Sequence, residues 1–343
     1  MTKFDQYTQD SRKILVITSQ PLDLDCIASG LVIKKYLQHI NKDAVLIFPR
    51  ELSPEEAEQY NFLPYFEEFN AKDSREYLAR GDFDTLILLD GTNWVQFYDY
   101  KNEELPAPVL DKSKKIIQID HHLGDPEDLA TYQIKNNKAS STVEVILSEI
   151  TLNNFIDESI ATLSYAGLVG DTGNFRWNFR AAAMKTAAML LEEGARTTEL
   201  LERTFFSKSR GYLDMLSYAI KNTEYDDELQ TQFLFMPLEK QQRDGISEEM
   251  LKLLGDAYTS ELANTVKGYP RGLYIKEFEE KGKIKISGRG SSMFNKINLP
   301  ILFSKLGGNG GGHFNAAGTS CTRDLEEVKK ELKDALREML KEV

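Results

Sequence analysis

The sequence predicts an α/β protein in which a parallel-sheet N-terminal domain is joined by a helical linker to a smaller mixed α/β C-terminal domain. Three observations predict this fold class. In the first half, short runs that are apolar throughout alternate with helical patterns, which is typical of a parallel sheet covered by helices on both faces. In the second half, two strand-like runs flank a short polar segment that ends in glycine, which indicates an antiparallel hairpin. The length of 343 residues also favours about two domains.

Four strands and four helices are expected in the first half. The expected strands are residues 14–18, 44–48, 85–89 and 115–119, and the expected helices are residues 27–40, 141–150, 159–168 and 181–193. The last of these helices stops at Gly194, and glycine is common directly after a helix. We therefore place the first domain at residues 1–195.

Residues 196–227 look helical and charged, which suits a linker, and residues 228–343 form the second domain. Its expected elements are a strand at 232–236, a hairpin of 272–278 with 283–287, a glycine-dense segment at 306–318 and a helix at 324–343. The helix is amphipathic because Leu325, Val328, Leu332, Leu336 and Leu340 recur at helical spacing.

Charge and composition exclude several classes of protein. The chain has 54 acidic and 42 basic residues, a net charge of −12, which argues against a surface that holds long nucleic acid. No run approaches the roughly 18 apolar residues of a membrane span, and the first residues lack the pattern of a signal peptide. We therefore expect a cytoplasmic protein that does not engage a membrane.

The two cysteines, Cys26 and Cys321, lie far apart and have no neighbouring cysteines. They form neither a disulfide framework nor a thiolate zinc site. Any metal ion would have to be held by oxygen and imidazole ligands.

Acidic residues and histidines gather where the expected strands and helices end. They are Asp23 and Asp25 after the first strand, Asp90 after the third, Asp120, His121 and His122 after the fourth, and Asp171 in an expected loop at 170–177. In open α/β sheets ligands bind beyond the carboxyl ends of the strands, so these side chains are expected to converge. A single Asp at such a place is more often a helix cap or a turn residue. Five of them with a pair of histidines favour one shared site.

Five carboxylates in one place would repel each other unless cations neutralised them. The simplest solution is a pair of divalent ions. Oxygen and imidazole ligands suit manganese, with magnesium, iron, cobalt and zinc as alternatives, and two such ions are the standard arrangement for displacing an oxygen at phosphorus.

These motifs resemble the DHH phosphoesterases, a family named for the triplet that is Asp120-His121-His122 here. The resemblance extends to Asp23-Leu24-Asp25, Leu89-Asp90-Gly91 and Gly170-Asp171-Thr172-Gly173, and to a C-terminal segment Gly310-Gly311-Gly312-His313-Phe314-Asn315-Ala316-Ala317-Gly318. That segment resembles the signature of the DHH-associated C-terminal domain of nanoRNases, cyclic-di-AMP phosphodiesterases and RecJ exonucleases. The resemblance spans residues 13–320.

The resemblance implies a role for each motif residue. Asp23 and Asp90 would hold the first ion, and Asp25, Asp90, His121 and Asp171 the second, with Asp90 bridging the two. Asp120 and His122 are expected as catalytic groups that orient His121 and the phosphate. A hydroxide activated by the two ions would attack phosphorus in line.

One position departs from the family pattern. The family carries a His four residues before its first motif Asp, and this chain has Ser19 there. Without that imidazole the first ion keeps Asp23, Asp90 and water, with Gln20 as a further source of oxygen. The alternative hypothesis is therefore a nucleotide-binding protein with a weakened or inactive metal site.

The second domain is predicted to bind the phosphate of the substrate. The glycine run lets backbone N–H groups approach an anion, so Gly311, Gly312 and His313 are candidate contacts, with a flexible surface loop as the alternative. In the resembling proteins the position of Arg289 binds a terminal phosphate, for which a guanidinium is well suited. Residues 267–305 contain nine basic and three acidic residues, a local net charge of +6.

A small basic surface in an acidic chain predicts short substrates. These are short oligonucleotides, linear or cyclic dinucleotides, or 3′-phosphoadenosine 5′-phosphate, and not long nucleic acid. Inorganic pyrophosphatase and a processive RecJ-like exonuclease are the disfavoured alternatives. A homodimer is left open.

Overall fold

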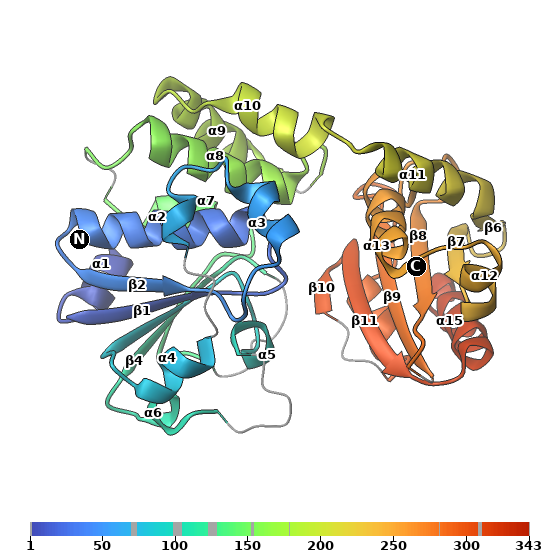
Figure 1. The fold of residues 1–343 in the computed structure, drawn as a ribbon, viewed down its shortest axis with the longest axis horizontal. Coiled ribbons are helices and arrows are strands. Elements are labelled where there is room, and N and C mark those ends of the chain that lie inside the picture. The colour runs from blue at the N-terminus through green and yellow to red at the C-terminus, as the bar shows by residue number, and fades with distance from the viewer. Residues whose placement is uncertain are drawn as a thin grey trace. The chain divides into compact units, whose positions relative to one another are not determined.

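The computed structural model describes residues 2–69, 74–98, 105–122, 129–151, 154–177, 179–280, 282–307 and 311–342. The chain divides into two compact units, Met1–Phe206 and Ser207–Val343, each built around one β-sheet (Figure 1). The expected linker range 196–227 contains helices α10 (Thr197–Leu201) and α11 (Arg210–Asn222), a π-helical turn at Glu202–Phe206 and the strand β6 (Glu224–Asp226). None of the helices in the described part of the chain has the length and apolar character needed to cross a bilayer.

The sheet of the first unit is entirely parallel, as predicted, with strand order β2-β1-β3-β4-β5. The strands are β1 (Lys13–Thr18), β2 (Asp43–Ile47), β3 (Thr85–Leu89), β4 (Lys115–Asp120) and β5 (Tyr132–Lys135). The chain passes from β1 to β2 on one side and then returns to β3 on the other side of β1. Ligand sites in open α/β sheets form beside such a reversal of strand order.

Helices cover both faces of this sheet. On one face lie α2 (Leu24–His39), α7 (Thr142–Glu149), α8 (Glu158–Thr172) and α9 (Ala181–Glu192), and on the other α4 (Ser74–Arg80), α5 (Trp94–Phe97) and α6 (Ala107–Leu110). The short helices α1 (Lys3–Thr8) and α3 (Pro54–Tyr60) complete the unit.

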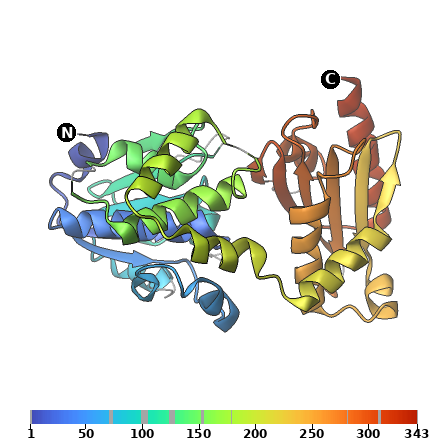
Figure 2. The same ribbon diagram turned by 90° about the horizontal axis from the view of Figure 1, so that it is seen from above.

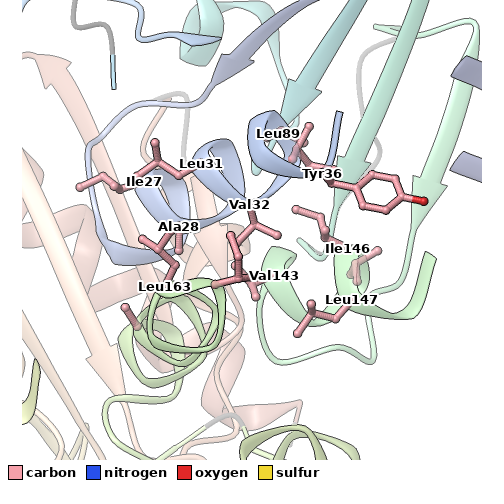
Figure 3. Packing of buried hydrophobic residues seen from close by; sticks show 14 of the residues in the cluster. Ile27, Ala28, Leu31, Val32, Tyr36, Leu89, Val143, Ile146, Leu147 and Leu163 are labelled. Atoms are coloured by element: carbon pink, nitrogen blue, oxygen red, sulfur yellow. The ribbon is translucent and has the colours of Figure 1, made fainter. Parts of the chain in front are cut away.

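The core between α2, α7 and α8 is formed by aliphatic side chains such as Ile27, Leu31, Val143 and Leu163 (Figure 3). Each of these four is fully buried. Burying one such side chain contributes about 1.5–3 kcal/mol relative to leaving it exposed. The packing fixes the positions of all three helices, and their ends carry the candidate site.

Two helix boundaries differ from the prediction in a way that moves site residues. Helix α2 begins at Leu24 because Asp23 caps it, so Asp25 lies in its first turn and not in a loop. Helix α8 continues to Thr172 and ends at Gly173, which has a φ of +53°. Asp171 therefore lies in the last turn of α8, and the expectation of a loop from residue 170 was wrong. Gly170 instead permits close packing, since a Cβ there would lie 2.8 Å from Leu24 Cβ.

The second unit has a mixed sheet with strand order β10-β11-β9-β8-β7-β6, in which only β7 and β8 are parallel neighbours. Its further strands are β7 (Thr231–Met236), β8 (Arg271–Glu277), β9 (Lys283–Gly290), β10 (Gly311–His313) and β11 (Ala316–Thr322). The predicted hairpin is confirmed as β8 and β9. Helices α14 (Leu299–Ser304) and α15 (Leu325–Lys341) pack on one face, and α11 and α13 (Glu248–Ala257) on the other (Figure 2). Helix α12 (Leu238–Arg243) follows β7.

Candidate metal centre

Two predicted ligands lie at the start of α2, directly after β1. Asp23 caps the helix, and its Oδ1 accepts a hydrogen bond from the Cys26 backbone N–H at 2.8 Å. Asp25 is fully buried, and its carboxylate accepts the backbone N–H groups of Thr142 at 2.6 Å and Val143 at 3.1 Å. These are the first two residues of α7, where the helix dipole favours a negative charge. Asp25 thus joins the start of α2 to the start of α7.

The third carboxylate, Asp90, follows β3 in a left-handed conformation with a φ of +65°. Asp tolerates this conformation better than most residues do. The Asp90 backbone N–H donates to the Ile119 carbonyl at 3.0 Å, and its Oδ1 accepts a hydrogen bond from Thr142 Oγ1 at 2.8 Å. Thr142 therefore holds Asp25 with its backbone and Asp90 with its side chain.

His121 and Asp171 complete a group of four. His121 is 2% exposed, and its Nε2 lies 2.9 Å from Asp171 Oδ2 and 3.7 Å from Asp90 Oδ1. Asp25, Asp90, His121 and Asp171 each offer one ligand atom, and these atoms lie within 4.8 Å of one another. The four residues are those expected to hold the second ion. They come from α2, the end of β3, the end of β4 and the end of α8.

Asp120 and His122 form a pair beside this group. Asp120 is fully buried, and its Oδ1 lies 2.7 Å from His122 Nδ1 and accepts the His122 backbone N–H at 3.1 Å. The ammonium group of Lys135 on β5 lies 3.5 Å from Asp120 Oδ2. A carboxylate at Nδ1 fixes the tautomer and orientation of an imidazole ring. Asp90, His121 and His122 form a second group, which overlaps the first and could also hold an ion.

The electrostatics of the centre favour bound positive charge. Burial raises the pKa of Asp25 and of Asp90 well above the usual range, and the neighbouring carboxylates, Asp171 for the former and Asp25 for the latter, raise it further. Asp23 is an exposed residue, yet the protein close to its carboxylate displaces water and, with the charge of Asp171, raises its pKa to about 6. Burial lowers the pKa of His121, but Asp171, Asp25 and Asp120 outweigh this effect and raise it to about 9.

When protons take the place of the cation in a cation site, its crowded carboxylates hold their protons and its imidazole gains one. The raised pKa values of these residues follow that pattern. The donor set of carboxylate oxygens and imidazole nitrogen suits manganese and the other divalent ions named above. The residues present therefore fit a divalent metal ion.

The first predicted ion site is less complete. Asp23 lies outside the group of four, and the position of the family His is taken by Ser19, which is 3% exposed. The Ser19 backbone N–H donates to the Leu89 carbonyl at 3.1 Å, and its own carbonyl accepts from Cys26 Sγ at 3.0 Å. The amide group of Gln20 donates to the Val95 carbonyl at 3.0 Å. The backbone at Ser19 is thus fixed between β3 and α2.

Sequence reasoning missed Thr142 and Lys135. A signal for Thr142 exists, because Ser141-Thr142-Val143-Glu144 has the spacing of a helix start, and Ser141 Oγ does accept the Glu144 backbone N–H at 3.1 Å. That pattern locates the start of α7 but not its contact with Asp25. Lys135 carries no comparable signal.

The predicted phosphate-binding residues lie on three neighbouring strands of the second unit. Arg289 is an exposed residue of β9, and in the register of the sheet it pairs with Ala316 of β11, which pairs with His313 of β10. Gly312 pairs with Ala317 and has a φ of +127°, and a Cβ there would lie 2.2 Å from the Ala316 carbonyl oxygen. Residues 308–310 of the glycine segment lie outside the described residues.

Comparison with known proteins agrees with this architecture. Residues 13–168 match the N-terminal domain of the DHH family, and residues 260–342 match the DHHA1 domain. An exopolyphosphatase-related protein from Bacteroides fragilis has a similar structure, with a TM-score of 0.78, 22% sequence identity, and coverage of 98% of this chain and 94% of that chain. CDC45 from Entamoeba histolytica gives a TM-score of 0.51 at 9% identity, with 96% of each chain covered.

A putative family II inorganic pyrophosphatase from Methanococcus jannaschii gives a TM-score of 0.45 at 16% identity, covering 94% of this chain and 99% of that chain. At 22% and 9% identity, the likeness to the Bacteroides fragilis and Entamoeba histolytica structures shows the fold alone. The two domain matches go further, and they bear out the resemblance of the sequence motifs at the level of the domains. The chain contains a DHH N-terminal domain at residues 13–168, followed by a DHHA1 domain at residues 260–342.

Proposed function

We propose that this protein is a metal-dependent phosphoesterase of the nanoRNase and cyclic-di-AMP phosphodiesterase kind. Its substrates would be short oligonucleotides, linear or cyclic dinucleotides, or 3′-phosphoadenosine 5′-phosphate. The observation that supports this most strongly is the group Asp25, Asp90, His121 and Asp171, whose ligand atoms lie within 4.8 Å of one another. The presence of both a DHH and a DHHA1 domain supports the same reaction class.

In this proposal Asp25, Asp90, His121 and Asp171 hold one ion, and Asp23 and Asp90 hold the other. Divalent ions, manganese foremost, would supply positive charge for the phosphate oxygens and lower the pKa of water at the site.

The remaining residues position the substrate. Asp120 holds Nδ1 of His122 at 2.7 Å, which fixes the ring so that its other nitrogen can bond a phosphate oxygen. Arg289 binds the terminal phosphate with two parallel N–H groups, and Gly311, Gly312 and His313 approach it from β10, which β11 separates from β9. These roles explain why a chain with a net charge of −12 would accept a short substrate and not a long polymer.

The test is hydrolysis of the three substrate classes in the presence of manganese. Asp90→Asn should lower kcat/KM by at least about 100-fold, because it removes one negative charge from the centre of the site. The matched control is Asp43→Asn, which changes an exposed aspartate at the start of β2 and should leave activity unchanged. A wild-type protein that hydrolyses none of the substrates, or an Asp90→Asn variant as active as wild type, would contradict the proposal.

Ser19 supports the second candidate function, a nucleotide-binding protein with a weakened or inactive metal site. Under that hypothesis Ser19→His creates activity where wild type has none, whereas in a competent enzyme the same change alters activity only modestly. The number of manganese ions bound at neutral pH distinguishes the two independently. Two ions indicate that Ser19 is tolerated, and one ion indicates an incomplete first site.

A further inference from the structure

Arg271, the first residue of β8, is the largest fully buried side chain of the described residues and is 2% exposed. Its Nε donates to Asn295 Oδ1 at 2.8 Å, and its Nη1 donates to the Leu229 carbonyl at 2.8 Å and to Thr231 Oγ1 at 2.9 Å. All three acceptors are neutral, and within the described ranges no carboxylate forms an ion pair with this guanidinium.

A buried guanidinium without a carboxylate is costly, because its hydration is lost and only neutral groups replace it. The cost is visible in the pKa of Arg271, which burial lowers to about 10. A buried apolar residue at this position would avoid the cost, so the contacts that the guanidinium makes require an explanation.

Asn295 is the neutral group that connects Arg271 to the rest of the domain. Its Oδ1 accepts from Arg271 and from the Ile297 backbone N–H at 3.1 Å, and its Nδ2 donates to the Ile297 carbonyl at 2.8 Å and to Asn315 Oδ1 at 2.7 Å. A guanidinium can only donate hydrogen bonds, so the oxygen of the Asn295 amide must face Arg271. The amide nitrogen must then face Asn315. Arg271 and the Ile297 backbone therefore set the orientation of the amide group together.

Asn295 and Asn315 join two segments that carry the proposed phosphate contacts. The Gly290 backbone N–H donates to the Asn315 carbonyl at 2.8 Å, and a Cβ at Gly290 would lie 2.4 Å from Asn295 Nδ2. The Ser291 backbone N–H donates to the Pro270 carbonyl at 2.7 Å, next to Arg271. The loop after β9, which follows Arg289, and the turn before β11, which follows His313, are thus held to one buried amide.

We infer that Arg271 is a positioning residue for the phosphate-binding surface formed by Arg289, Gly311, Gly312 and His313, and that it acts through Asn295. This inference rests on the proposed function, which assigns phosphate binding to those four residues. Arg271 does not touch the substrate. It fixes the distance between the strand end that carries Arg289 and the turn that follows β10.

The test uses Asn295→Asp in the full chain. The variant keeps the acceptor for Arg271, and the new carboxylate pairs with the buried guanidinium, so the domain should remain folded. It loses both donations from Nδ2 and faces Asn315 Oδ1 with a second oxygen. We expect KM for 3′-phosphoadenosine 5′-phosphate with manganese to rise about tenfold while kcat changes less than about twofold, because binding is weakened and the metal centre is not altered.

Two further measurements separate positioning from general stability. Hydrogen exchange of the Gly290 amide should be faster in Asn295→Asp than in wild type. The double variant Arg289→Ala with Asn295→Asp should have no higher KM than Arg289→Ala alone. The effects of two substitutions are not additive when one residue acts through the other. The matched control is Lys276→Met, which removes another buried cation of β8, paired with Glu248, and should change neither KM nor the exchange of Gly290.

If the enzyme is active, two results would overturn this inference and leave the proposed function standing. One is an unchanged KM for Asn295→Asp, and the other is a double variant in which the effects of Arg289→Ala and Asn295→Asp on KM multiply. A wild-type protein that neither binds nor hydrolyses the nucleotide, with Arg289→Ala equal to wild type, would overturn the proposed function and this role of Arg271 together.

Discussion

Thr142 ties two buried carboxylates of the candidate centre, those of Asp25 and Asp90, to the fold. Its backbone N–H bonds Asp25 at 2.6 Å and its hydroxyl bonds Asp90 at 2.8 Å. The three residues lie on α7, on α2 and after β3, so one residue fixes the spacing between ligands from separate elements. A group of this kind orients metal ligands without binding the ion, and its loss typically reduces metal affinity or activity by 10- to 100-fold.

The first prediction compares two variants at this residue. Thr142→Val keeps the size of the side chain and the bond to Asp25 but removes the hydroxyl, so manganese affinity should fall by about tenfold or more. Thr142→Ser keeps the hydroxyl and should stay close to wild type. Titration of manganese into the metal-free protein measures both. Equal affinities for the two variants would show that the bond to Asp90 has no influence on the ion.

At the scale of elements, helix α8 approaches α2 and α7 unusually closely at Gly167. A Cβ at Gly167 would lie 2.7 Å from Val143 Cγ2 and 2.8 Å from Asp25 Oδ1. Asp25 cannot easily move away, because backbone N–H groups at the start of α7 donate hydrogen bonds to its carboxylate. The same glycine therefore serves helix packing and the geometry of the candidate metal centre.

The second prediction is that Gly167→Ala destabilises the protein by about 1–3 kcal/mol and lowers manganese affinity, because the methyl group forces Val143 or Asp25 to move. The control is Gly211→Ala in the first turn of α11, where the nearest atom to a Cβ is 3.5 Å away. That variant should be neutral or more stable by up to about 1 kcal/mol, since alanine favours helix. Denaturant unfolding measures the first effect. A Gly167→Ala variant as stable as Gly211→Ala would refute the packing argument.

The sequence predicts four strands of the first sheet closely and misses the fifth, β5, which lies at one edge. The bounds of β3 agree with the prediction, and those of β1, β2 and β4 differ by one residue, because these strands are apolar runs between polar segments. Strand β5 was missed, since only Ile134 among its four residues is buried. The end of α8 was placed too early because Gly170 reads as a helix terminator in the sequence, whereas in the fold it allows contact with Leu24.

At the scale of the whole molecule, the candidate site also divides into residues that a local sequence pattern predicts and contacts that it does not. Asp90 and Asp120 could be predicted because they directly follow strands whose apolar pattern is clear. The bond from Thr142 to Asp25 spans 117 residues, and the bond from Arg271 to Asn295 depends on a buried charge that the sequence presents as one more basic residue. Such contacts are properties of the assembled fold and leave no local pattern.

The third prediction concerns the stability of the whole metal-free protein against pH. Asp23 has a pKa of about 6 in the fold against 3.8 as the ordinary value, and His121 about 9 against 6.5. Both values are raised, so each group stabilises the fold fully below its ordinary pKa and loses that contribution as pH rises through the folded pKa. Asp25 and Asp90 shift in the same direction. With EDTA present, Tm should therefore fall as pH rises from about 5 to about 9.

Manganese should reverse this loss, because an ion that binds only the folded protein stabilises it by mass action. The rise in Tm on adding manganese should be larger at pH 8 than at pH 6, since fewer protons then compete for the ligands. Asp90→Asn should show a smaller rise than wild type, and Asp43→Asn an equal one. A metal-free Tm that increases over this pH range would contradict the assignment of the raised pKa values.

The left-handed backbone of Asp90 limits which residues evolution or a laboratory library can place there. Most side chains would add about 1–2 kcal/mol of steric strain at a φ of +65°, whereas glycine, asparagine and aspartate add little. A library of all residues at this position would therefore yield two nested sets. Selection for a folded protein alone would enrich Asp, Asn and Gly, and selection for turnover would reduce that set to Asp. The left-handed backbone thus restricts position 90 to Asp, Asn and Gly, and the negative charge required for turnover restricts it further to Asp.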